Sequence, residues 1–284
     1  MQDSLPVAAL AALLAALAAL ALWAWLRRRG RLPGRRRWRP VRPPLPVVLV
    51  HGLFGFDELA IGRKRHAYFR GITPRLQKAG RKVIQARLPA AGSVERRAEA
   101  LAAAVRALPD RRVILLAHSM GGLDARHAIA RLGLAPRVAA LVSVGTPHRG
   151  TPLADLTADL AGRLGIVRAL AFAGVSLEAL RDLTGERLLR FNEEAADVRS
   201  VAYASVVGTV RRKRRVHPLL LPGHLWLAEK SGDNDGVVPA DSQRWGEVVT
   251  EIDADHWAQI GWSRHFDAGR FYVRILEELE ASGL

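Results

Sequence analysis

The segment 117–121, Ala-His-Ser-Met-Gly, contains the residue best placed for nucleophilic chemistry, Ser119. An apolar run at 113–116 precedes it and predicts a buried strand, and a segment with helical character follows it. A serine at the tight turn between a strand and a helix presents its hydroxyl to a base and a substrate at once. Ala117 and Gly121 are small, as the close approach of strand and helix requires. An ordinary turn can also carry a serine and a glycine, so the motif needs further support.

An acid and a base follow this serine in the chain order Ser, Asp, His. Asp235 lies on the polar turn 231–239, and His256 comes directly after the strand-like segment 248–252. A buried carboxylate can fix the tautomer of the imidazole and stabilise its charged form. We prefer Asp235 to Asp233 as the acid because it lies closer to two apolar valines in the same turn, while Asp233 and Asp241 remain alternatives.

A site for the negative charge of acyl transfer is predicted in the loop 51–55, which follows the apolar strand-like segment 46–50. Backbone N–H groups at such a turn can point toward the developing oxyanion. The second donor would be the N–H after the nucleophile, that of Met120. Gly52 and Gly55 allow the loop to bend. We expect His51 to shape this loop rather than to act as the base.

A metal site is a weaker interpretation of the same polar residues. Segment 233–236, Asp-Asn-Asp-Gly, resembles part of an EF-hand loop, but Arg244 occupies the twelfth position, where that loop needs a glutamate. The histidines are scattered without ligand-like spacing. Those outside the proposed site are expected to line loops or surfaces: His118, His148, His224 and His265. The chain has no cysteine, which excludes a thiol nucleophile and any disulfide. We predict no metal and no cofactor.

Several motifs together resemble the triacylglycerol lipases of the Pseudomonas and Burkholderia type. The matching segments run from about residue 46 to 272 and are 51–57, 117–122, 144–151, 183–184, 191–192, 234–238 and 255–256. The resemblance implies an α/β-hydrolase fold, with Ser119 as nucleophile, Asp235 as acid and His256 as base. It also implies that the N–H groups of Leu53 and Met120 form the oxyanion hole.

The sequence departs from these lipases where they hold a structural calcium. They usually keep an aspartate two residues after the catalytic histidine, and here that position is Ala258. Trp262 replaces a glutamine expected further along, and segment 211–215 supplies five cations where another carboxylate might stand. Calcium needs several oxygen ligands, so we do not expect it to bind.

The order of the predicted elements indicates a mostly parallel sheet with helices on both faces. We place the hydrolase domain at 46–284 and its strands at 46–50, 82–86, 113–117, 138–144, 200–207 and 247–253. Helices are expected from Ser93 to Leu108, after Ser119 as far as Gly133, and at about 267–281. The segment at about 151–225 is predicted to be an insertion that forms a helical cap. Its apolar residues either cover an acyl site or form ordinary core: Leu164, Ile166, Val167, Leu170, Phe172 and Val175.

The first 26 residues predict a transmembrane anchor. Residues 4–26 carry no charge, and at ~1.5 Å per residue they would span roughly 34 Å as a helix. Trp23 and Trp25 suit a membrane interface, and the uncharged stretch is longer than a cleavable signal peptide needs. A linker rich in arginine and proline follows at 27–45.

The charge pattern then predicts the location of the protein. The net charge is +16, and nine of the arginines lie at 27–42, directly after the predicted span. Placed there, they favour anionic headgroups over nucleic acid as the partner. Their excess on one side of the span predicts a single-pass membrane protein with its catalytic domain in the cytoplasm, the alternative being a periplasmic or extracellular domain.

The sequence as a whole predicts a membrane-anchored serine hydrolase that cleaves carboxylic esters, most of all lipid esters, through an acyl-enzyme. A phospholipase or acyl-thioesterase with the same triad is the alternative within this chemistry. A non-catalytic, membrane-tethered binding domain is disfavoured because a nucleophile, a base, an acid and an oxyanion loop are all present.

Overall fold

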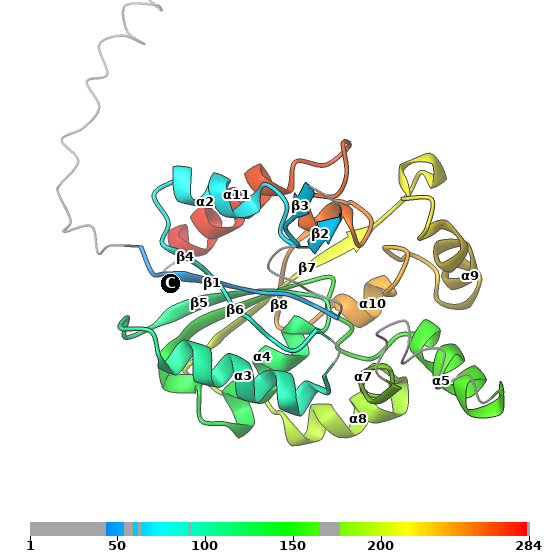
Figure 1. The fold of residues 1–284 in the computed structure, drawn as a ribbon, viewed down its shortest axis with the longest axis horizontal. Coiled ribbons are helices and arrows are strands. Elements are labelled where there is room, and N and C mark those ends of the chain that lie inside the picture. The colour runs from blue at the N-terminus through cyan, green and yellow to red at the C-terminus, as the bar shows by residue number, and fades with distance from the viewer. Residues whose placement is uncertain (1–43, 54–58, 62–63, 91, 165–176, 283–284) are drawn as a thin grey trace, which may run out of the picture. The chain divides into compact units, whose positions relative to one another are not determined.

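A computed structural model describes residues 44–53, 59–61, 64–90, 92–164 and 177–282 (Figure 1). Six parallel strands form its main sheet, in the order β4-β1-β5-β6-β7-β8. Their bounds are β1 Val47–Val50, β4 Val83–Gln85, β5 Val113–His118, β6 Val138–Val144, β7 Ala202–Thr209 and β8 Glu247–Asp253. The predicted strands and their parallel arrangement are confirmed.

The central strands are apolar on both faces because helices cover both. In β1, Val47 and Leu49 join the core on one face, whereas Val48 and Val50 join the core on the other. The same period of two runs through β5, where Ile114 lies on the side of Val47. Strands buried on both faces read as continuous apolar runs, which is why these two were recognisable in the sequence.

Four helices make the two outer layers. Helices α2 (Ile72–Lys78) and α11 (Ala268–Ala281) cover one face of the sheet, and α3 (Val94–Arg106) and α4 (Gly121–Arg131) cover the other (Figure 1). The Ser93 side chain accepts a hydrogen bond from the backbone N–H of Arg96 at the start of α3. Asp267 caps α11 in the same way.

The remaining elements lie mostly beyond the carboxyl ends of the strands. They are the antiparallel pair β2 (Leu59–Ile61) and β3 (Lys64–His66), helices α5 (Pro152–Leu164), α7 (Leu177–Arg181), α8 (Gly185–Glu194), α9 (Leu221–Ser231) and α10 (Ala240–Gln243), and 3₁₀ turns at Ala135–Arg137, Lys213–Arg215 and Ala258–Ile260. The range 151–225 therefore holds the helices expected of a cap, and it also holds β7 of the main sheet. The apolar cap residues from Leu164 to Val175 lie outside the residues whose side chains are described.

The predicted membrane location is corrected. Across the described residues, we find no helix that combines the length and the apolar character needed to cross a bilayer. The predicted anchor at 1–26 and nearly all of the linker at 27–45 fall outside the described residues. The prediction of a single-pass membrane protein with a cytoplasmic domain is therefore wrong on this finding, and we do not retain it.

Candidate active site

Ser119 occupies the turn between β5 and α4. Its φ of 56° makes it the one residue other than glycine with a positive φ in the described part of the chain. Such a conformation is costly for a side chain with a Cβ and persists where the surroundings enforce it. Its N–H donates to the carbonyl of Val144 at 3.0 Å, and its carbonyl accepts from the Thr146 hydroxyl at 2.8 Å. Strand β6 and the loop after it thus hold the turn.

Two glycines allow the loop after β1 to approach this turn. A Cβ added at Gly121 would lie 2.7 Å from the carbonyl oxygen of Val50, closer than real contacts allow. A Cβ at Gly52 would lie 2.7 Å from the Cβ of Ser119 and 3.1 Å from its Oγ. The loop that carries Gly52 and Leu53 therefore passes directly beside the serine hydroxyl.

His256 and Asp235 complete a line of hydrogen bonds that starts at Ser119. His256 Nε2 lies 3.0 Å from Ser119 Oγ, and His256 Nδ1 lies 2.7 Å from Asp235 Oδ2. The backbones are linked as well, because the N–H of His256 donates to the carbonyl of Asp235 at 2.9 Å. Ser119 directly follows β5 and His256 comes soon after β8, whereas Asp235 follows helix α9. Its turn is brought to the carboxyl end of β7 because the N–H of Val210 donates to the carbonyl of Asn234 at 3.1 Å.

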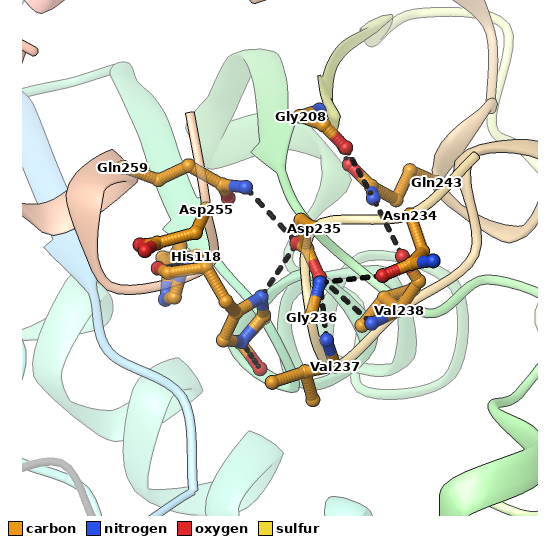
Figure 2. Close-up of polar contacts among 12 residues, drawn as sticks. His118, Gly208, Asn234, Asp235, Gly236, Val237, Val238, Gln243, Asp255 and Gln259 are labelled. Atoms are coloured by element: carbon orange, nitrogen blue, oxygen red, sulfur yellow. Dashed lines mark hydrogen bonds and ion pairs between the residues drawn. The ribbon is translucent and has the colours of Figure 1, made fainter. Parts of the chain in front are cut away.

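The carboxylate of Asp235 is fully buried and accepts four hydrogen bonds (Figure 2). Oδ1 accepts from the backbone N–H groups of Val237 and Val238, at 3.0 and 2.7 Å. Oδ2 accepts from His256 and from the Gln259 side chain, the latter at 2.9 Å. Four donors thus fix the position and orientation of this carboxylate.

The two alternative acids do not reach the histidine. Asp233 is exposed, and the side chain of Asp241 is 94% exposed and pairs with Arg244 at 3.5 Å. Among the three aspartates considered from the sequence, only Asp235 is brought to His256. Its role as the acid remains a prediction.

The two residues proposed to supply the oxyanion donors, Leu53 and Met120, belong to one apolar cluster. Met120 is fully buried and precedes the first turn of α4, and Leu53 packs against the same apolar cluster. Arg97 supports the loop from behind, since it donates to the carbonyl of His51 at 2.6 Å and pairs with buried Asp124 at 2.8 Å. The ring of His51 hydrogen-bonds within its own loop and accepts from the N–H of Leu88, so it shapes the loop as expected.

The expectation that the other histidines line loops or surfaces is wrong for two of them, because His118 belongs to β5 and His224 belongs to α9. His118 and His148 are fully buried, and His224 is nearly so. His118 is the last residue of β5 and contacts Tyr68 and His256, while His148 contacts Ser143 and stacks on Trp245. His265 is exposed as expected, and His148, although buried, lies on the loop after β6.

Sequence reasoning also missed Tyr68, Arg97 and Gln259, all of them polar groups in contact with the site. Tyr68 and Arg97 lie on segments that carry no motif. Gln259 follows His256 by three residues, so its place in the short helical turn after the base was a usable signal.

These buried histidines predict that the protein loses stability in acid. Burial lowers the pKa of both His118 and His148 well below the usual value. Below pH ~6.5 the unfolded chain binds protons that the folded chain does not, so the free energy of unfolding should fall by about 1.4 kcal/mol per histidine per pH unit. Urea denaturation at pH 7.5, 6.0 and 5.0 measures this slope.

A substitution separates His148 from other acid-sensitive groups. His148→Gln should flatten the slope by the share of one histidine, whereas His265→Gln, at an exposed position, should leave it unchanged. Equal slopes in wild type and His148→Gln would contradict the prediction.

Comparison with known proteins places the chain in a family. Residues 47–268 match the alpha/beta hydrolase family. A triacylglycerol lipase from Pseudomonas fragi is 30% identical to the chain, over 84% of the chain and 97% of the lipase. The chain is an α/β-hydrolase. The resemblance predicted from its motifs is confirmed.

Further similar proteins agree with this assignment. A triacylglycerol lipase from Burkholderia plantarii is 40% identical over 123 residues, which are 40% of the hydrolase and 33% of that lipase. The crystal structure of a mature lipase from Bacillus licheniformis shares the fold with a TM-score of 0.67, at 22% identity over 85% of the hydrolase and 94% of that chain. Because such relatives are lipases, the predicted enzyme class, carboxylic ester hydrolase, is confirmed.

The residues of this hydrolase do not fit the calcium of the lipases that it resembles. Both side-chain oxygens of Asp255, the residue before the base, accept hydrogen bonds from backbone N–H groups. Oδ1 accepts from Trp257 and Ala258, and Oδ2 accepts from His217. The neighbouring Asp253 pairs with Arg215 at 2.5 Å. These carboxylates are thus satisfied by N–H donors and a guanidinium group, whereas a calcium ion needs several oxygens directed at one point.

Proposed function

We propose that this hydrolase cleaves carboxylic esters by a Ser119–His256–Asp235 triad, and that its substrates are lipid esters. The observation that carries the proposal is the unbroken line of contacts, 3.0 Å from Ser119 Oγ to His256 Nε2 and 2.7 Å from His256 Nδ1 to Asp235 Oδ2. Both distances lie within hydrogen-bond reach of a nucleophile and its base.

The geometry supports the following sequence of steps. Ser119 Oγ attacks the ester carbonyl carbon while His256 Nε2 takes the hydroxyl proton, and the N–H groups of Leu53 and Met120 stabilise the oxyanion. The intermediate collapses, the alcohol leaves with the proton from His256, and an acyl group stays on Ser119. Water then attacks this acyl group with His256 as base, which releases the carboxylic acid and restores the serine.

Asp235 orients the base in this scheme. Its charged Oδ2 accepts from His256 Nδ1, which leaves the lone pair of Nε2 free to face the serine. The same carboxylate stabilises the imidazolium that forms when the proton moves. Burial strengthens both effects because little solvent screens the pair.

Lipid esters are favoured as substrates by the relatives and by the surface of helices α5 and α9. The Pseudomonas fragi and Burkholderia plantarii relatives are triacylglycerol lipases. Helices α5 and α9 pack against each other and expose apolar side chains, among them Leu156, Leu160 and Leu225, at 39, 40 and 37%. Apolar groups left exposed on neighbouring helices suit contact with acyl chains.

A fluorophosphonate probe and a substrate panel test the proposal. The probe should label the wild-type chain at Ser119 and leave Ser119→Ala unlabelled. With triacylglycerol emulsions, phospholipids, acyl thioesters and short soluble esters compared at equal enzyme, the emulsified long-chain esters should be hydrolysed fastest. Labelling without lipid hydrolysis would keep the triad and overturn the lipid substrate, whereas absence of labelling would overturn the triad.

A further inference from the structure

A second line of hydrogen bonds runs beside Ser119, through the side chains of Tyr68 and His118. The backbone N–H of Gly52 donates to the Tyr68 hydroxyl at 3.1 Å, and that hydroxyl lies 2.7 Å from His118 Nδ1. His118 Nε2 lies 3.1 Å from the backbone carbonyl of His256. Every group in this line is buried. The line joins the loop proposed to bind the oxyanion to the main chain of the proposed base.

The chemistry of the ends fixes the direction of each hydrogen bond. A carbonyl oxygen only accepts, so His118 Nε2 must carry a hydrogen and donate it to His256. Burial lowers the pKa of His118 well below its usual value, so the ring is neutral and its Nδ1 has no hydrogen. Nδ1 therefore accepts from Tyr68, whose oxygen in turn accepts from the N–H of Gly52. One tautomer satisfies all four groups.

We propose that Tyr68 and His118 are positioning residues, which hold the loop at Gly52 and the backbone of His256 in register around Ser119. The inference rests on the proposed function, in which Leu53 and His256 act on the substrate. Neither Tyr68 nor His118 touches the reacting atoms in this scheme. Each acts through the backbone group that it holds.

The relative position of Gly52 and His256 matters because both lie next to the Ser119 hydroxyl. Gly52 passes so close to Ser119 that an added Cβ would meet Oγ at 3.1 Å, and the next residue, Leu53, carries the proposed oxyanion donor. His256 Nε2 contacts the same hydroxyl at 3.0 Å. A shift of either element by about 1 Å could cost on the order of 100-fold in rate. A buried link between them prevents the two from moving apart independently.

The neutral state of His118 suits this role. Its ring centroid lies 4.5 Å from that of His256, so a charge on His118 would oppose the imidazolium that forms on the base during catalysis. The neutral Nε2–H tautomer gives a hydrogen bond to the backbone of His256 without adding charge beside its ring.

Tyr68→Phe removes the hydroxyl from the middle of the line and keeps the ring. We expect kcat on a soluble p-nitrophenyl ester to fall about 10-fold or more, with KM changed less than about 2-fold, because alignment rather than binding is lost. The rate of inactivation by a fluorophosphonate should fall with kcat.

Tyr272→Phe is the matched control. Tyr272 is also a buried tyrosine of the same core, and among the described residues its hydroxyl has no hydrogen-bond partner, so its loss should leave kcat unchanged. A wild-type kcat in Tyr68→Phe would overturn the proposal. An inactive, unlabelled wild type would instead overturn the proposed function, so the two failures are distinguishable.

A double-mutant cycle tests whether the two residues act as one line. His118→Gln keeps an N–H donor that can reach the His256 carbonyl and removes the ring nitrogen Nδ1 that accepts from Tyr68. The double variant with Tyr68→Phe should be no slower than the slower single variant, because the shared link can be lost only once. If the fold-decreases in kcat of the two single variants multiplied in the double variant, the two residues would act independently, which would overturn the proposal.

Imidazole ¹⁵N chemical shifts test the proposal on the wild-type protein, so the result does not depend on whether a variant folds. In the wild-type protein they should show His118 as the neutral Nε2–H tautomer throughout the pH range of activity. A neutral Nδ1–H tautomer, or a charged ring in that range, would contradict the directions assigned to the line and overturn the proposal.

Discussion

Replacing Ser119 with alanine is expected to lower kcat on a soluble ester by at least about 10,000-fold, with the fold intact. The hydroxyl oxygen at this position is the atom that His256 Nε2 contacts at 3.0 Å, and the sharp turn that holds it is fixed by backbone contacts rather than by the hydroxyl. The initial rate of p-nitrophenyl butyrate hydrolysis, normalised to folded protein, measures the loss.

His256→Ala should lower kcat about as much as Ser119→Ala does, and the double variant should lower it little more. A nucleophile without its base and a base without its nucleophile are equally inactive. Ser143→Ala is the control. Ser143 is a buried serine of β6 that contacts His148 and a backbone carbonyl, and its loss should affect stability more than kcat. Substantial activity in Ser119→Ala would show that another residue attacks the ester.

The sequence was most informative where chemistry and local structure coincide. Strands β1, β5 and β6 are buried on both faces, so their continuous apolar runs located them to within about a residue. Ser119 was found because a tight strand–helix turn demands small neighbours, and a Cβ at Gly121 would indeed clash with the backbone of Val50. These signals are local, so one sequence contains them.

The contacts behind the site could not be predicted because they join distant segments. Tyr68 and His118 are 50 residues apart, and His118 and His256 are 138 apart. No periodicity links such positions. Burial of His118 was also hidden, because a histidine is mostly an exposed or half-exposed residue unless its ring nitrogens find partners. The partners here become visible only once the sheet brings the ends of β1, β5 and β8 together.

The structure gives a physical reason for the preference of Asp235 over Asp233 as the candidate acid. Asp235 was preferred for its apolar neighbours, and the backbone N–H groups of Val237 and Val238 both donate to its Oδ1. The turn that buries the carboxylate thus also supplies its donors. Asp233, two residues earlier, points to solvent.

Asp235→Asn should lower kcat by about 10,000-fold while leaving the site almost unchanged in shape. The amide NH₂ of asparagine cannot replace Oδ1, where it would face two backbone N–H donors that cannot turn away, so it must replace Oδ2. There the Gln259 amide can rotate so that its Oε1 accepts one hydrogen, and the other hydrogen points at His256 Nδ1. That nitrogen must then accept, which moves the imidazole hydrogen to Nε2, toward the serine hydroxyl. A base in this tautomer cannot take the serine proton.

Asp233→Asn is the control for this substitution, since it makes the same change two residues away on an exposed side chain. It should retain nearly the wild-type kcat and the same melting temperature. The two variants are compared on one soluble ester, with ¹⁵N shifts of His256 to report its tautomer. If Asp233→Asn proved the slower of the two, the contact of 2.7 Å between Asp235 and His256 would be structural only, and the assignment of the acid would fail. If Asp235→Asn instead loses activity while His256 changes to the Nε2–H tautomer, the carboxylate acts by keeping His256 in the tautomer that can accept the proton of Ser119.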